Sequence, residues 1–206
     1  MTRLPPDRRR SELVDAALRV IDRNGIRGAT TRAIVAEADM PLGSFHYVFR
    51  SRDAMLRDLI AAVVDQERRV ASDAVRAGVG IRATVRSALQ AYFDLVVADP
   101  SREQAMFELL HYALRTESLA DLPAAQYRSY RSAALELLQV GAERAGVRWA
   151  MPQEDVARLV VTLTDGLTLG WLADRDAAAA GRIMDAAADA LAALTEPAVA
   201  SAGRGA

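Results

Sequence analysis

The chain has 206 residues, 51% of them apolar and only 5% aromatic, with a net charge of −1, no cysteine and two histidines far apart. This composition favours helices packed on helices over a β-rich fold, and it excludes disulfides and thiolate metal sites, so a cytoplasmic protein without cofactors is expected. The N-terminus has no apolar run behind its charges, so no signal peptide is expected, and no uninterrupted apolar stretch is long enough to predict a membrane span.

The charges are distributed unevenly along the chain. Residues 1–57 hold 11 Arg against 7 acidic residues, a net charge of +4, whereas the remainder holds 15 Arg against 20 acidic residues. A basic head on an acidic body suits local contact with phosphates. Arg8, Arg9 and Arg10 form a basic arm that either enters a DNA minor groove or is a solvated, disordered run.

The first helix is predicted from about Arg10 to Asn24, because apolar residues recur there every three or four positions and form one stripe. The stripe consists of Leu13, Ala16, Ala17, Val20 and Ile21. Gly25 follows as the predicted C-terminal cap. Thr30 or Thr31 is expected to cap a short second helix. The inward face of this second helix would be Ile34, Val35 and Ala38.

Residues 30–52 have the pattern of two short helices joined by a tight turn. Asp39 lies at the turn, and Pro41 suits the first turn of the next helix, where its missing N–H costs nothing. That next helix places small polar and aromatic residues between apolar anchors, so it can pack on a core and still enter a DNA major groove. The anchors are Phe45, Val48 and Phe49, and the residues between them are Ser44, His46 and Tyr47.

The chain beyond residue 50 is predicted to continue as long helices. Ser51 is expected to cap the fourth helix, and Gly78 with Gly80 marks the clearest internal boundary. The five helices expected beyond it are Ile81–Ala98, Ser101–Arg115, Pro123–Ala145, Pro152–Ala173 and Ala178–Leu194. No segment shows the alternating pattern of a half-buried strand, and the tail from Glu196 is expected to be disordered.

The helix expected from Pro152 is apolar around nearly its whole circumference, and such a helix must be buried on all sides. The core of a chain this small covers one face, so the other face most simply meets a second subunit, where Gly166 and Gly170 allow close approach. With the last helix, two copies would form a four-helix interface about a twofold axis. The alternative is a central core helix of a monomer. The predicted interface residues are Val156, Val160, Leu163, Leu167, Gly170, Trp171, Met184 and Leu191.

The segment from Leu13 to Leu56 resembles the DNA-binding region of the TetR family of bacterial transcriptional regulators. The anchors at the family's spacing are the Ala16-Ala17 pair, Gly25, the Thr30 region, Ile34, Ala38, Gly43, Phe49 and Ser51-Arg52-Asp53. A weaker resemblance, to the family's dimerisation helix, runs from Asp165 to Asp174.

Three positions depart from the family's usual pattern. Asp39 stands where the turn usually has Gly, although Asp tolerates a left-handed conformation better than most residues. His46 stands where the recognition helix usually has Tyr, with Tyr47 next to it, and Val35 replaces a usual Ala.

The resemblance implies an all-α protein of about nine helices, with a three-helix helix-turn-helix DNA-binding domain and a larger ligand-binding and dimerisation domain. It also implies a homodimeric repressor that a small-molecule effector releases from a palindromic operator. The expected division is 1–50 for the arm and DNA-binding domain, 51–80 for the connecting fourth helix, 81–195 for the effector-binding and dimerisation domain, and 196–206 for the tail.

Hydroxyl and backbone N–H groups at a helix start can bind a phosphate, and a glycine lets the backbone approach DNA closely. Side chains of the third helix can donate to bases, and an arginine before the fourth helix can clamp the backbone. Each residue alone also has a structural reading, as a helix cap or a solvated side chain. The expected DNA-binding residues are Thr30, Thr31, Arg32, Leu42, Gly43, Ser44, His46, Tyr47 and Arg52.

The region between Ile81 and Trp171 is where the family usually holds a small molecule, and bulky apolar side chains there suggest a hydrophobic or aromatic effector. Aromatic and Met residues at helical spacing also suit a plain core. Asp165, an acid within an apolar helix, either bridges helices at the dimer interface or contacts the ligand. The candidate lining residues are Tyr92, Phe93, Met106, Phe107, His111, Tyr127, Tyr130, Thr162, Asp165 and Thr168.

An enzyme and a protein-binding adaptor are the two alternative classes of function. An enzyme finds little support, because the sequence has no nucleophile elbow, phosphate-binding glycine loop or zinc-helix motif. Glu108 and His111 can be drawn as an acid–base pair one helical turn apart, but no further group joins them. A helical adaptor that binds only proteins is the second rival, and the charge asymmetry argues against it.

Overall fold

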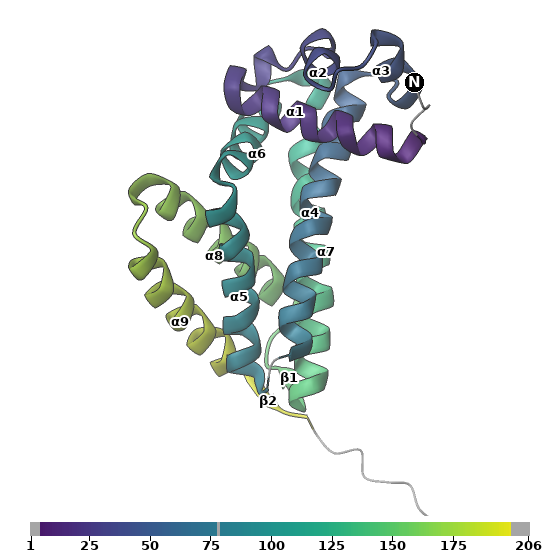
Figure 1. Ribbon diagram of the computed structural model, residues 1–206. Helices are drawn as coiled ribbons and strands as arrows, with labels where there is room; N and C mark the ends of the chain where they lie inside the picture. Colours follow the sequence, from purple (N-terminus) through teal and green to yellow (C-terminus); the bar gives the residue numbers. More distant parts are fainter. Residues whose placement is uncertain (1–4, 78, 199–206) are drawn as a thin grey trace, which may run out of the picture. The chain divides into compact units, whose positions relative to one another are not determined.

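The computed structural model describes residues 5–77 and 79–198, and that part of the chain is helical apart from two short strands (Figure 1). The α-helices are α1 (Pro6–Gly28), α2 (Thr31–Glu37), α3 (Leu42–Val48), α4 (Arg52–Ala77), α5 (Ile81–Ala98), α6 (Pro100–Ala113), α7 (Leu122–Ala145), α8 (Gln153–Asp174) and α9 (Ala177–Ala193). A 3₁₀ helix, η1 (Glu117–Leu119), precedes α7, and the strands are β1 (Val147–Trp149) and β2 (Thr195–Pro197). The predicted fold class is therefore confirmed, with nine α-helices in the described residues.

Contacts within the chain divide it into two compact units. The head unit holds the described residues up to Gln66 together with Val96–Ser129, and the body unit holds Glu67–Leu95 together with the described residues from Tyr130 onward. Helices α4, α5 and α7 are continuous through both units. The head therefore includes α6, which packs on α1 although it comes much later in the chain.

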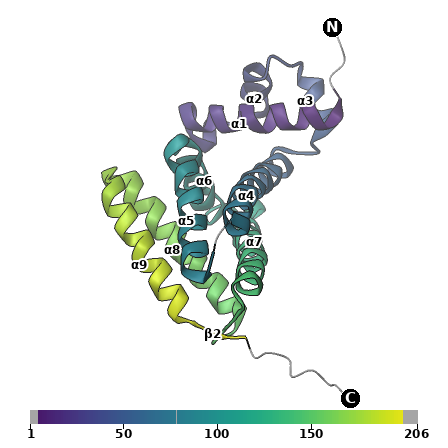
Figure 2. The same ribbon diagram turned by 60° about the horizontal axis from the view of Figure 1, so that its bottom comes forward.

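The head unit is built on the apolar stripe of α1, against which α2, α3 and α6 pack (Figures 1 and 2). All five predicted stripe residues of α1 are buried. Ile34 and Val35 of α2 are buried as predicted, whereas Ala38 is half-buried at the end of that helix. Phe45 of α3 has no exposed surface, so this short helix is held by a fully buried anchor.

The caps and turns of the head follow the sequence signals. The hydroxyls of Thr30 and Ser51 each accept the backbone N–H three residues further on, at 3.2 and 3.0 Å. Asp39 has a φ of 51°, so the turn between α2 and α3 keeps its left-handed conformation with Asp in place of Gly. Gly25, with φ 69° and ψ 170°, interrupts the helical geometry of α1, in a region that is essentially open only to glycine.

The prediction of a basic N-terminal arm is wrong for Arg8, Arg9 and Arg10. Helix α1 begins at Pro6, so all three arginines lie in its first turns. Proline is favoured at the start of a helix because its φ is already helical and its missing N–H would be unpaired there anyway.

The expectation of a strand-free chain is also wrong, since β1 and β2 pair antiparallel with Arg148 opposite Glu196. Strands of three residues are too short for an alternating pattern, and their pairing joins segments nearly fifty residues apart. Glu196 and Pro197, expected in a disordered tail, are part of this pair, whereas residues 199–206 of the predicted tail lie outside the described residues.

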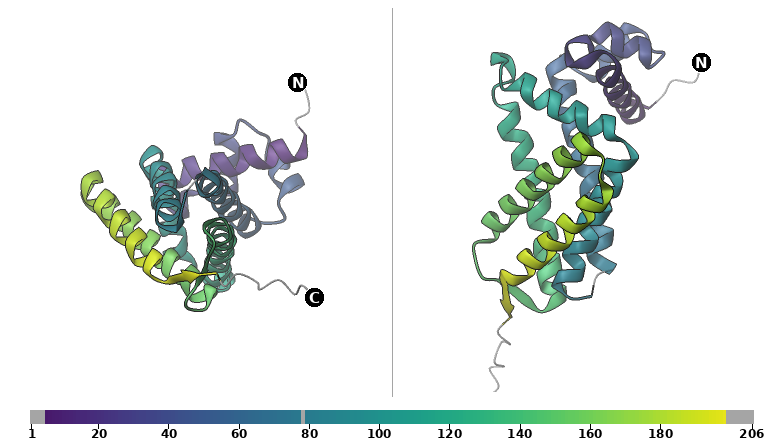
Figure 3. Two further views of the ribbon diagram at one scale, coloured as in Figure 1. Left: turned by 90° about the horizontal axis from the view of Figure 1, so that it is seen from below. Right: turned by 90° about the vertical axis from the view of Figure 1, so that its left-hand side faces the viewer.

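In the body unit α8 and α9 lie side by side and are joined by a short connection (Figures 1 and 3). Asp176 caps α9 by accepting the backbone N–H of Ala179 at 2.8 Å. By length and a mean hydropathy of 1.3, α8 is apolar enough to cross a membrane, contrary to the sequence expectation, but a core helix of a soluble protein has the same properties.

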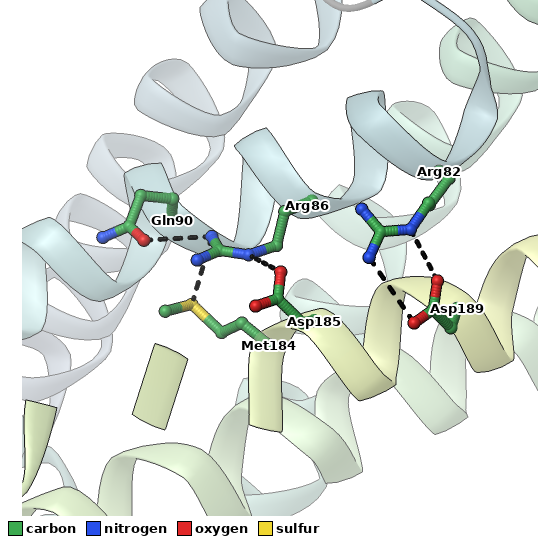
Figure 4. A network of polar contacts seen from close by, with 6 residues as sticks. All are labelled: Arg82, Arg86, Gln90, Met184, Asp185 and Asp189. Atoms are coloured by element: carbon green, nitrogen blue, oxygen red, sulfur yellow. Dashed lines mark hydrogen bonds and ion pairs between the residues drawn. The ribbon is translucent and has the colours of Figure 1, made fainter. Parts of the chain in front are cut away.

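A network of polar contacts joins α5 to α9 in the body unit (Figure 4). Arg82 donates to Asp189 at 2.5 and 3.4 Å, and Arg86 donates to Asp185 at 2.8 Å. The hydrogen bond from Arg82 holds the pKa of Asp189 below its ordinary value. Figure 4 shows both arginines on the same side of α5, so the network fixes one face of α9 against that helix.

Candidate functional site

Helix α3 presents polar and aromatic side chains outward from a buried anchor, as the sequence predicts. Phe45 is completely buried and packs against Phe49 at a tilt, with ring centroids 5.3 Å apart. His46 is exposed, and Tyr47 exposes 61% of its surface. The other predicted DNA-binding residues with exposed side chains or backbone are Thr30, Arg32, Leu42 and Gly43, while Thr31 and Ser44 are half-buried.

Gly43 stands in the first turn of α3 with open space around it. A Cβ added to Gly43 would meet no atom of the described chain within 4 Å. Its φ is not in the left-handed region, so neither packing nor backbone conformation within the chain requires glycine there. The absence of a side chain leaves the backbone of α3 accessible from outside.

The first turns of α1 pack against α3, an arrangement that the sequence reasoning missed. The guanidinium of Arg9 lies 5.2 Å from the centre of the Tyr47 ring, and that of Arg10 lies 5.2 Å from the centre of the Phe49 ring. Arg10 also forms an ion pair with Asp58 of α4. Arg9 and Arg10 therefore help to position α3, and Arg9 orients the exposed ring of Tyr47.

Arg52 was expected to clamp the DNA backbone, but its guanidinium is bound within the head unit. Its Nε donates to the carbonyl of Ala29 at 2.7 Å, and a second nitrogen donates to the carbonyl of Ile26. The same guanidinium lies over the ring of Tyr112, 5.6 Å from its centre. Arg52 therefore holds the chain that leads from α1 into α2. Only its N–H groups outside these two hydrogen bonds are available to bind another group.

A polar hollow of about 560 Å³ lies beside these residues in the head unit. It is lined by Arg27, Thr30, Thr31, Arg52, Tyr112 and Thr116. Guanidinium and hydroxyl donors of this kind suit a phosphate oxygen. Sequence reasoning missed Arg27, Tyr112 and Thr116, and only the charge of Arg27, one turn before the Thr30 cap, offered a local signal.

Helix α2 is tied to α1 by a cluster of charges on its outer side. Glu37 accepts from Nε of Arg19 at 2.7 Å and also pairs with Arg23. The hydrogen bond from Arg19, followed by that from Arg23, lowers the pKa of the Glu37 carboxyl. The cluster fixes the end of α2 that leads into the turn at Asp39.

The candidate effector-binding residues fall into two groups. Met106, Phe107, His111 and Tyr127 belong to the head unit, and Tyr92, Phe93, Tyr130, Thr162, Asp165 and Thr168 belong to the body unit. In the body, the hydroxyls of Tyr92 and Thr168 are 2.7 Å apart, and Phe93 packs edge-on against Trp171 at 5.6 Å. Trp171 is buried and its indole N–H has no hydrogen-bond partner in the described structure.

Thr162 and His111 do not join these clusters. Thr162 is exposed and lines a groove between α8 and α9, and His111 is exposed on α6. Glu108, considered with His111 as an acid–base pair, accepts a backbone N–H from Ile26 instead. Within residues 5–77 and 79–198, no group of three or more His, Asp or Glu side chains could hold a metal ion.

The predicted interface residues divide into buried and accessible ones. Val156, Leu167, Trp171, Met184 and Leu191 are already buried by the chain itself, so their apolar character reflects the core and they offer little surface to a partner. Gly170 is exposed, and Val160 and Leu163 are half-buried. Helix α8 is therefore not covered on all sides within one chain.

The accessible face of these two helices lies along the groove between them. The groove has a volume of about 280 Å³ and includes Thr162, Gly166, Gly170 and Ile183. Ile183 exposes 54% of its surface, and Leu169 of α8 exposes 49%. Periodicity pointed to α8 and α9 but did not show which side of them remains open within the chain.

Comparison with known proteins gives two family matches that together span most of the chain. Residues 13–59 match the profile of bacterial regulatory proteins of the tetR family, and residues 81–196 match that of the C-terminal region of BetI-type transcriptional repressors. The chain is 30% identical over 166 residues to the HTH-type nicotine-responsive transcriptional repressor HdnoR of Paenarthrobacter nicotinovorans, a match that covers 81% of this chain and 84% of that protein.

Solved structures show the same fold. A transcriptional regulator from Pseudomonas aeruginosa PAO1 has a TM-score of 0.73 with 25% identity, covering 93% of this chain and 94% of that one. A TetR-family regulator from Rhodococcus sp. has a TM-score of 0.77 with 20% identity, covering 90% of this chain and 98% of that one.

Proposed function

Because this chain belongs to the TetR family of bacterial transcriptional regulators, we propose that it acts in the cytoplasm as a homodimeric repressor that binds a palindromic operator and leaves it when a small molecule binds. The observation that carries the proposal is α3, which exposes His46 and Tyr47 from a fully buried Phe45 anchor inside a matching DNA-binding segment.

The DNA-contacting surface comprises α3 and the start of α2. Ser44, His46 and Tyr47 supply donors for base edges or phosphates, and Leu42 supplies an apolar contact. Gly43 lets the backbone approach the duplex, since nothing in the chain occupies the space of its missing Cβ. Thr30, Thr31 and the free N–H groups of Arg52 line the hollow, where they would bind a phosphate. Arg32, exposed in the first turn of α2, would bind a phosphate outside it.

A second copy is proposed to pack on the groove between α8 and α9. Recognition helices must stand about 34–36 Å apart to enter successive major grooves, which a twofold dimer of this family provides. Ile183 exposes apolar surface in the groove, Leu169 exposes apolar surface on α8, and Gly166 and Gly170 leave room for a partner helix. Of the interface residues predicted from the sequence, Val160, Leu163 and Gly170 are the proposed contacts.

The effector is proposed to be a small hydrophobic or aromatic molecule. The side chains Tyr92, Phe93, Tyr130 and Thr168 belong to the body unit, where an aromatic ligand would find ring partners and hydroxyl donors. The nicotine response of the similar repressor makes nitrogen-containing aromatic compounds the first class to screen. A ligand can bind more tightly to a conformation whose two DNA-binding heads do not match the spacing of the major grooves. Such a ligand lowers operator affinity by the ratio of its affinities for the two conformations.

The test is binding of the purified protein to its own upstream intergenic DNA and to a genomic DNA pool over a salt series. A repressor should bind selectively at nanomolar concentration, and its affinity should fall steeply with salt because counterions are released. Tyr47→Ala should weaken binding, whereas Leu114→Ala, an exposed head residue outside α2 and α3, should not. A folded dimer that selects no DNA would favour the protein-binding adaptor instead.

A further inference from the structure

The segment from the break in α1 at Gly25 to the start of α2 is held by side chains from later helices. We call this segment, residues 25–30, the connector. Gly25 breaks the helical geometry at its start, and Thr30 caps α2 at its end. The position of the connector therefore sets where α2 begins, and α2 leads through the turn at Asp39 into α3.

The peptide groups of Ile26 are bound on both sides. Oε1 of Glu108, on α6, accepts the N–H of Ile26 at 2.8 Å. The guanidinium of Arg52, on α4, donates to the carbonyl of Ile26 and, at 2.7 Å, to that of Ala29. The carboxylate thus replaces the partner that an unbroken helix would give the Ile26 N–H, and the guanidinium joins the Ala29 N–H, 3.3 Å away, at the Ile26 carbonyl. Hydrogen bonds to charged groups are stronger than neutral ones.

The fit between Glu108 and the break in α1 is close. A Cβ on Gly25 would lie 2.9 Å from Oε1 of Glu108, nearer than real side chains approach. The missing side chain at Gly25 therefore admits the carboxylate to the Ile26 N–H. Tyr112, one turn along α6 from Glu108, lies under the guanidinium of Arg52 at 5.6 Å.

Helix α6 belongs to the C-terminal region by sequence and to the head unit by its contacts. By sequence it lies within residues 81–196, which match the C-terminal repressor profile, but by contact it belongs to the head unit. Through Glu108, the C-terminal region thus binds the backbone that leads into α2 and α3.

We infer that Glu108 is a positioning residue for DNA recognition: its carboxylate holds the connector so that α2 and α3 present their contacts in register. The inference rests on the proposed DNA-binding function. It assigns to Glu108 no contact with DNA.

Charge makes the test sharp, because removing a negative charge from a DNA-binding head should strengthen DNA binding if electrostatics alone acted. Glu108→Ala removes both the charge and the acceptor, and we expect operator affinity to fall by about tenfold or more, the effect of losing a charged hydrogen bond. Glu108→Gln removes the charge but keeps an acceptor oxygen for the Ile26 N–H, so it should bind at least as tightly as the wild type. Glu117→Ala, an exposed acid of the head unit, is the matched control for charge.

Two readouts separate positioning from general loss of structure. Affinity for random-sequence DNA and the active fraction in stoichiometric titration should stay unchanged in Glu108→Ala, while operator affinity falls. A partly unfolded protein would lose all three. Operator binding by Glu108→Ala as tight as by the wild type would overturn the inference.

Amide hydrogen exchange gives an answer that does not depend on DNA. Exchange at Ile26 should accelerate in Glu108→Ala and stay slow in Glu108→Gln and Glu117→Ala. If the wild type selects no DNA, the proposed function fails. Unchanged exchange at Ile26 in Glu108→Ala would overturn the inference even then, whereas accelerated exchange would support only the hold of Glu108 on the connector.

Discussion

Two glycines of the head unit show how the same residue serves different needs. Gly25 has a positive φ, so its backbone conformation requires glycine, and any side chain there would displace the carboxylate of Glu108. Gly43 has ordinary helical geometry and open space around it, so the fold does not require it. A requirement for glycine at position 43 would therefore come from a partner outside the chain.

Gly25→Ala should destabilise the protein by about 1–3 kcal/mol, because the φ/ψ region is nearly closed to other residues and the new methyl group displaces Glu108. Gly146→Ala is the matched control, since Gly146 also has a positive φ but no atom near its missing Cβ. Urea unfolding should show the larger loss for Gly25→Ala. Equal losses would mean that the contact with Glu108 adds nothing.

Gly43→Ala should leave stability unchanged or raise it by about 0.5–1 kcal/mol, because alanine is the better helix former and meets no clash. If α3 approaches DNA through its backbone, the same change should weaken operator binding. Thermal unfolding and operator titration on one preparation measure both effects. Undiminished affinity would show that α3 does not approach the duplex at this point.

At the scale of whole elements, exposed ion pairs join α2 and α9 to neighbouring helices. Glu37 joins α2 to α1, and the Arg82–Asp189 pair joins α9 to α5. Such exposed pairs are individually weak. Their main effect is to select one orientation for a helix that its apolar face alone would leave free to slide.

Asp189→Asn should lower the thermal midpoint slightly at neutral pH, and the difference from the wild type should vanish in acid. The folded-state pKa of Asp189 is below its ordinary value of 3.8, so its contribution is present above that pH and is lost as the pH falls further. Melting curves between neutral pH and pH 3 would test this. Asp15→Asn, at an exposed aspartate with no ion-pair partner in the described structure, should show no such convergence.

The sequence predicts these elements well where the signal is local. The helix expected from Ile81 to Ala98 has those ends, and the Thr30 and Ser51 caps form as expected. Contacts such as that of Glu108 with Ile26 join positions 82 residues apart and leave no local pattern. For the same reason apolar spacing in α8 identified an unusual helix but not its exposed side, which depends on what packs around it.

At the scale of the whole molecule, the proposed dimer would bring two heads to one operator. If the groove between α8 and α9 is the interface, Ile183→Asp should give a monomer, because it places a charge on exposed apolar surface of that groove. Val140→Asp places the same charge on an exposed apolar side chain of α7 and should leave the proposed dimer intact. Light scattering after size-exclusion chromatography gives the mass, and a dimeric Ile183→Asp protein would place the interface elsewhere.

The small antiparallel pair β1–β2 has a consequence for how such regulators diversify. The N–H of Ala150 bonds to the carbonyl of Leu194, and the N–H of Ala198 bonds to that of Gly146. The α8–α9 hairpin thus leaves and re-enters the fold at one place, with its two ends stapled together. We expect that a segment closed in this way can be replaced by that of a relative only if its contacts with α5, such as Arg82–Asp189 and Tyr92–Thr168, are kept as well.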